Sequence, residues 1–65
     1  MPIVHITLQK GRTRAQKDML FQRVTAAIHE SLGANPQSIR IILEEVDAMD
    51  FAVGGVPLAL RDQKT

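Results

Sequence analysis

The chain has 65 residues, with 8 basic and 7 acidic side chains, a net charge of +1 and no cysteine. The absence of cysteine excludes disulfides and thiolate metal sites, and the balanced charge argues against a nucleic-acid partner held by phosphate contacts. No apolar run reaches the roughly 18 residues of a membrane span, and no secretory signal is visible, so a cytoplasmic location is expected.

A chain of this length is expected to form one domain, residues 1–65. So small a domain buries only roughly 60% of the surface that its unfolded chain exposes. Without disulfides or a metal, oligomerisation is the expected supplement to its stability. Hydrophobic residues make up 45% of the sequence and supply apolar surface for such contacts.

The first predicted element is a strand over residues 2–8. Val4, Ile6 and Leu8 alternate with two polar residues, which indicates one strongly apolar face.

A helix is predicted to begin after a polar break at residues 9–12. Thr13 and Gln16 have the spacing of a capping box. Apolar residues follow at helical spacing and form one stripe: Leu20, Val24, Ala27, Ile28 and Leu32. Gly33 stands where a left-handed C-terminal cap is expected, and Pro36 follows shortly after it.

A second strand is predicted over residues 39–45, with Ile39, Ile41 and Leu43 on one face. Strand, helix and strand in succession predict a βαβ unit with parallel strands. The pair Gly54-Gly55 predicts a short C-terminal hairpin, which completes an α+β fold. Because a two-stranded sheet is marginal alone, pairing of strand edges between copies is expected.

Pro2 and Arg12 are the first candidates for chemistry. If Met1 is removed, Pro2 becomes a terminal secondary amine, which is a base; the alternative is a proline that merely begins an edge strand. Arg12 follows Gly11 in the loop after the first strand, where its planar fork could bind a carboxylate or simply face solvent.

Arg40 lies between two isoleucines of the second predicted strand. An unpaired buried charge would be costly there. Arg40 therefore faces solvent, forms an ion pair with Glu44 or Glu45, or lines a site.

The remaining candidates are expected to have structural or solvated positions and no chemical role. Phe51 is expected to pack in a core or an interface, and the two histidines are expected to be structural or solvated. Four carboxylates near the second strand lack the spacing of a calcium loop and are expected to be solvated: Glu44, Glu45, Asp47 and Asp50. No metal site is predicted.

In combination, these features resemble the 4-oxalocrotonate tautomerase family. The match runs in register over about residues 2–58. The residues that carry it are Pro2-Ile3, Gly11-Arg12, Gln16-Lys17, Leu20, Ser38-Ile39-Arg40, Phe51 and Gly54-Gly55.

The resemblance implies a dimer with a four-stranded sheet and two helices on one face, and a hexamer built as a trimer of dimers. Sites then lie at subunit interfaces, and no cofactor is needed. The partner is an enol or keto carboxylic acid, as in the breakdown of aromatic compounds.

The resemblance also implies roles for five residues. Pro2 would take the proton of a dienol 2-hydroxyl and return it at carbon, and Arg12 would bind a distal carboxylate. Arg40 of a neighbouring subunit would contact the 2-oxygen, Ser38 would contribute to substrate binding, and Phe51 would form an apolar wall. Desolvation and the two arginines would lower the pKa of the Pro2 amine toward working pH.

Some positions depart from the family pattern. Asp62 stands where a basic residue is common, and Pro57 follows the glycine turn. Relatives that hydrate or dehalogenate acids use an acidic residue just after the aromatic position. Here Ala52 follows, although nearby Asp50 keeps that chemistry open. A non-catalytic oligomeric binding protein of the same fold is the other alternative.

Overall fold

The computed structural model describes residues 1–60. Two strands and one long helix form its main body: β1 (Ile3–Gln9), α1 (Arg14–Leu32) and β2 (Arg40–Val46). A small hairpin follows, with β3 (Ala52–Val53) and β4 (Val56–Pro57). Three 3-10 turns complete the described residues: Pro36–Ser38, Ala48–Asp50 and Leu58–Leu60. Asp62 lies outside the described residues.

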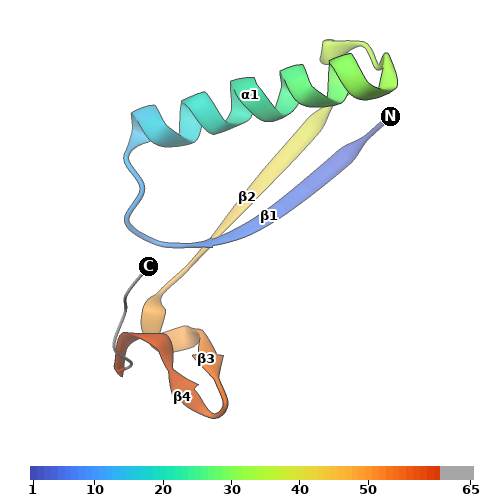
Figure 1. Cartoon of the computed structure of the whole chain (residues 1–65). Coiled ribbons are helices and arrows are strands. Elements are labelled where there is room, and N and C mark those ends of the chain that lie inside the picture. Colours follow the sequence, from blue (N-terminus) through green and yellow to red (C-terminus); the bar gives the residue numbers. More distant parts are fainter. Residues whose placement is uncertain (61–65) are drawn as a thin grey trace.

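β1 and β2 form a parallel two-stranded sheet, with Ile3 opposite Arg40 and Gln9 opposite Val46. α1 connects them and covers one face of the sheet (Figure 1). The predicted βαβ unit and hairpin are therefore confirmed. Both strands begin one residue later than predicted.

The pleat gives the sheet two different faces. On β1, Val4, Ile6 and Leu8 are half-buried on the side of α1, while the residues between them are exposed. On β2, Ile41 and Leu43 are likewise half-buried between exposed neighbours. The apolar residues that alternate in the sequence thus form the sheet face that packs against the helix.

Both ends of α1 have the predicted caps. The Thr13 hydroxyl accepts a hydrogen bond from the Gln16 backbone N–H at 3.1 Å, and Thr13 N–H donates to Gln16 Oε1 at 2.9 Å. At the other end Gly33 has a φ of 70°, in the left-handed region, and its N–H donates to His29 O at 2.9 Å.

The predicted apolar stripe of α1 is wrong at two positions. Ala27 is exposed and 71% of Leu32 is exposed, whereas Phe21 joins the half-buried side. Nineteen helical residues span about 28 Å and seven strand residues only about 23 Å. We attribute the exposure of Leu32 to this mismatch, which leaves the last turn of α1 projecting beyond the sheet.

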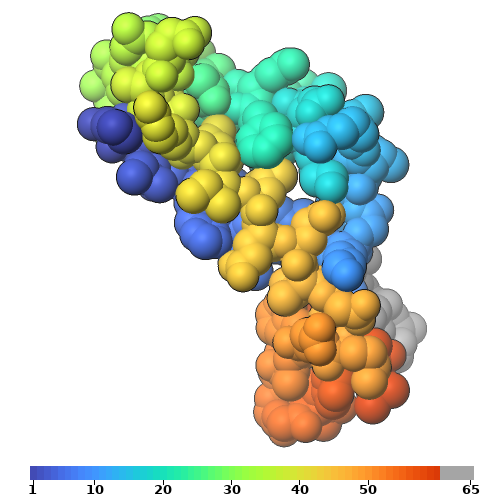
Figure 2. All heavy atoms as spheres, turned by 180° about the vertical axis from the view of Figure 1, so that it is seen from behind, coloured from blue at the N-terminus to red at the C-terminus, as the bar shows by residue number. Residues whose placement is uncertain are grey.

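The C-terminal hairpin projects away from α1 and forms a second lobe (Figures 1 and 2). Gly54 and Gly55 form its turn with φ values of 62° and 85°, which favour glycine. The radius of gyration is 14.9 Å, against about 11 Å for a compact domain of this length. None of residues 1–60 is fully buried, so the described chain has no closed core.

Within residues 1–60, no helix is both long and apolar enough to cross a membrane.

Candidate active site

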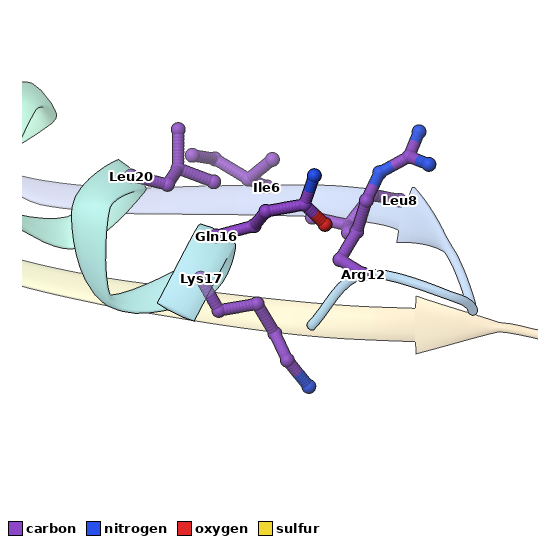
Figure 3. A pocket seen from close by; sticks show the side chains of 6 residues that line it. All are labelled: Ile6, Leu8, Arg12, Gln16, Lys17 and Leu20. Atoms are coloured by element: carbon purple, nitrogen blue, oxygen red, sulfur yellow. The ribbon is translucent and has the colours of Figure 1, made fainter. Parts of the chain in front are cut away.

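An open pocket of about 390 Å³ lies between β1 and the first turns of α1. Its floor is formed by apolar side chains from two elements: Ile6 and Leu8 from the sheet, and Leu20 from the helix (Figure 3). Arg12, Gln16 and Lys17 supply the polar groups around it. The pocket therefore combines an apolar surface with a cation suited to a carboxylate.

Arg12 lies in a short loop whose ends are both hydrogen-bonded. Before it, Lys10 N–H donates to Val46 O at 2.9 Å. After it, Thr13 begins the capping box of α1. Gly11 makes the turn with a φ of 122°. Arg12 is exposed and forms no ion pair within residues 1–60, so its guanidinium is available to an anion.

Lys17 lines the same pocket, but its charge is already paired. Its Nζ lies 3.1 Å from Glu45 Oε2, and the two side chains are only 20% and 32% exposed. Figure 3 shows the Lys17 ammonium and the Arg12 guanidinium pointing in opposite directions. Arg12 is thus the unpaired cation of the pocket.

The four carboxylates at the end of β2 and just after it are exposed, as expected, but three of them also have partners. Glu45 pairs with Lys17, as above. Glu44 Oε1 lies 3.1 Å from His5 Nε2 and accepts from the Thr7 hydroxyl at 3.3 Å, on the outer face of the sheet. Asp47 accepts from Met49 N–H and caps a 3-10 turn.

Pro2 and Arg40 meet at the opposite end of the sheet. The Arg40 N–H donates to Pro2 O at 3.0 Å, so the backbones of the two residues are joined. Pro2 is half-buried, and its nitrogen is an amide because Met1 precedes it. Loss of Met1 is therefore a condition for any basic role of Pro2.

The Arg40 side chain lies exposed on the sheet face turned away from α1. Its Nη1 donates to Ser38 O at 3.1 Å, and the Ser38 hydroxyl donates to Asn35 O at 2.8 Å. Of the three expected arrangements, no ion pair with Glu44 or Glu45 forms in the described chain. Arg40 keeps donors free toward solvent.

One chain does not bring the predicted site residues together. Pro2, Ser38 and Arg40 lie at one end of β1, and Arg12 follows its other end, about 23 Å away along seven strand residues. Phe51 lies at the base of the hairpin, 42% exposed, with its carbonyl accepting from Leu58 N–H.

The sequence interpretation missed the apolar floor of the pocket. The sequence pattern predicts a strand face for Ile6 and Leu8 and a helix stripe for Leu20, but it does not place the three residues in one pocket. The signal was present, because these are the same two surfaces that converge beside the loop of Arg12.

This architecture is that of the small 4-oxalocrotonate tautomerase homologues. TomN, a 4-oxalocrotonate tautomerase homologue in the tomaymycin biosynthetic pathway, matches with a TM-score of 0.87 and 36% identity, over 89% of each chain. A heterohexamer 4-oxalocrotonate tautomerase from Chloroflexus aurantiacus matches with a TM-score of 0.86 and 32% identity, over 94% of this chain and 100% of that one.

Sequence comparison gives the same assignment. The sequence model of the family described as "Tautomerase enzyme" matches residues 2–61. A Bacillus cereus protein named "Probable tautomerase" is 41% identical over 59 residues, which cover 91% of this chain and 97% of the relative. The chain belongs to the tautomerase family.

Proposed function

We propose that the chain, after loss of Met1, is a keto–enol tautomerase that converts a 2-hydroxydienoate such as 2-hydroxymuconate to the α,β-unsaturated 2-oxo acid. One observation carries this proposal within the family. Arg12, an arginine without an ion-pair partner in residues 1–60, stands beside an apolar pocket of about 390 Å³. A flat, unsaturated dicarboxylate fits this site, because its carbon chain can lie on the apolar surface while one carboxylate binds the arginine.

A second copy of the chain completes the site in this proposal. One edge of β1 is unpaired within residues 1–60. Antiparallel pairing of this edge with its copy sets the start of one β1 beside the end of the other. The Pro2 amine of one subunit then lies near the pocket and Arg12 of its partner. The heterohexamer of the Chloroflexus aurantiacus relative supports extension to a homohexamer.

The reaction then follows from three groups. The Pro2 amine removes the proton of the 2-hydroxyl, the oxygen's electron pair forms the C=O bond, and the double bonds shift along the chain. The ammonium returns the proton to the far carbon of the diene, so atoms and charge balance. Arg12 holds the distal carboxylate, and Arg40 stabilises the charge that develops on the 2-oxygen.

Ser38 and Phe51 complete the proposed site. Ser38 acts through its backbone, since its carbonyl accepts from Arg40 Nη1 and so holds the guanidinium. Phe51, more than a third exposed in the single chain, supplies an apolar wall from another subunit. In the proposed setting the protein works in the cytoplasm, in the breakdown of aromatic compounds.

The test compares two preparations of the protein whose masses show Met1 removed or retained. We expect the chain lacking Met1 to ketonise 2-hydroxymuconate about 10²-fold to 10⁴-fold faster, the range of positioned proton transfer. Equal rates in the two preparations would exclude Pro2 as the base. No activity of the mature chain on any enol acid would favour the non-catalytic alternative, and turnover of halogenated or acetylenic acids instead would favour the hydratase-like one.

A further inference from the structure

Of the three ion pairs within residues 1–60, the pair of Lys17 and Glu45 joins the helix to the sheet. The other two pairs lie within α1 or on the outer sheet face, with their side chains 55–67% exposed. Lys17 and Glu45 are 20% and 32% exposed. Screening by water and salt is therefore weakest for this pair.

The Lys17 stem separates two hollows. One is the pocket that contains Arg12. The other, of about 230 Å³, lies over β2 and is lined by Arg14, Lys17, Phe21, Leu43 and Glu45. Glu45 lines the second hollow and pairs with the Lys17 ammonium, which points away from the Arg12 guanidinium (Figure 3).

The same end of β2 also holds the loop that carries Arg12. The residue after Glu45, Val46, accepts a hydrogen bond from Lys10 N–H, just before the loop. Beyond the loop, Lys17 N–H donates to Thr13 O at 3.1 Å in the first turn of α1. Glu45 and Val46 thus restrain the chain on both sides of Arg12.

We propose that Lys17 and Glu45 are positioning residues for Arg12. Their ion pair fixes the first turn of α1 against the end of β2, and so places the Arg12 guanidinium at the distance of a substrate's second carboxylate. The inference rests on the proposed function, in which Arg12 binds the distal carboxylate.

The test is Glu45→Gln, because Glu45 does not line the Arg12 pocket. We expect KM for a dicarboxylate enol to rise about fivefold, with kcat within about twofold and with KM for a monocarboxylate enol unchanged. If the pair had only a structural role, the variant would change KM for both substrates alike. Glu45→Asp keeps the charge, so its KM for the dicarboxylate should return close to the wild-type value.

Asp18→Asn is the matched control. Asp18 pairs with Arg14 in the same part of α1, at 2.8 Å, but both side chains are exposed and neither contacts β2 through this pair. We expect unchanged KM values for both substrate classes. If Glu45→Gln behaves like Asp18→Asn, or lowers KM for the dicarboxylate, the positioning role is refuted.

Arg12→Ala separates failure of this inference from failure of the proposed function. Equal KM changes for the two substrate classes in Arg12→Ala would refute both. If Arg12→Ala raises KM for the dicarboxylate alone, and Glu45→Gln does not, the positioning role is refuted while the proposed function stands. If Glu45→Gln does not fold, Glu45→Ala, which also removes the charge, decides: a KM raised for the dicarboxylate alone supports the role, and an unchanged KM refutes it.

Discussion

Arg40 shows how one charged residue is accommodated in an apolar strand. Its neighbour Ile41 faces the helix, and alternation along the strand directs Arg40 to the outer face. There its guanidinium keeps contact with water and makes one hydrogen bond, to Ser38 O. The cost of an unpaired buried charge is thus avoided, and donors remain for a substrate oxygen.

Arg40→Ala is expected to lower kcat on 2-hydroxymuconate by about 10²-fold to 10³-fold, the usual loss when a donor to a developing oxyanion is removed. Steady-state kinetics measure this. Because Arg40 is exposed in the single chain, thermal unfolding at equal protein concentration should change little. Wild-type kcat in the variant would contradict the assigned role.

The separate roles of Arg12 and Lys17 could not have been predicted from the sequence. Each is a basic residue near the start of a helix. What distinguishes them is Glu45, which is 28 positions beyond Lys17 in the chain and comes within reach only when Leu8 lies opposite it in the sheet. Such a pair depends on strand register, which local patterns do not supply.

At the scale of elements, local signals predicted most of the fold. The capping box and Gly33 fixed both helix ends, and the alternation of apolar residues assigned the sheet faces. The one-residue shift of β2 has a local cause, because Ile39 caps the preceding 3-10 turn and its N–H donates to Pro36 O. That turn also has a readable signal, since Asn35 Oδ1 accepts from Gln37 N–H.

Removal of the helix cap tests this reading. Thr13→Ala is expected to cost about 1 kcal/mol of stability, because it leaves the Gln16 N–H without its partner at the start of α1. Thermal unfolding at fixed protein concentration measures the loss. Gln22→Ala, at an exposed position of the same helix, should stay within about 0.5 kcal/mol. A Thr13→Ala protein as stable as Gln22→Ala would contradict the capping role.

At the scale of the whole molecule, the decisive feature is that residues 1–60 form no closed core. Large apolar side chains remain exposed over the whole described chain, among them Ile3 at 64%, Ile42 at 49% and Val53 at 46%. Two of these lie on the outer sheet face and one on the hairpin. Burial of such surface by other copies is the physical basis for the proposed oligomer.

The midpoint of thermal unfolding is therefore expected to fall on dilution, because subunit association stabilises the folded state by mass action. Melting curves over about a hundredfold range of concentration, with sedimentation to give the mass, measure this. A midpoint that is independent of concentration, together with a monomer mass, would contradict the proposal.

The distance between Pro2 and Arg12 along β1 has a genetic consequence. If each site takes its base from one subunit and its arginine from another, two defective alleles can compensate for each other. A chain with a blocked Pro2 lacks the base, and a chain lacking Arg12 binds the dicarboxylate weakly, so each is defective alone. In a mixed dimer, however, one site receives the intact proline of one chain and the intact arginine of the other, so random association would restore about a quarter of the sites.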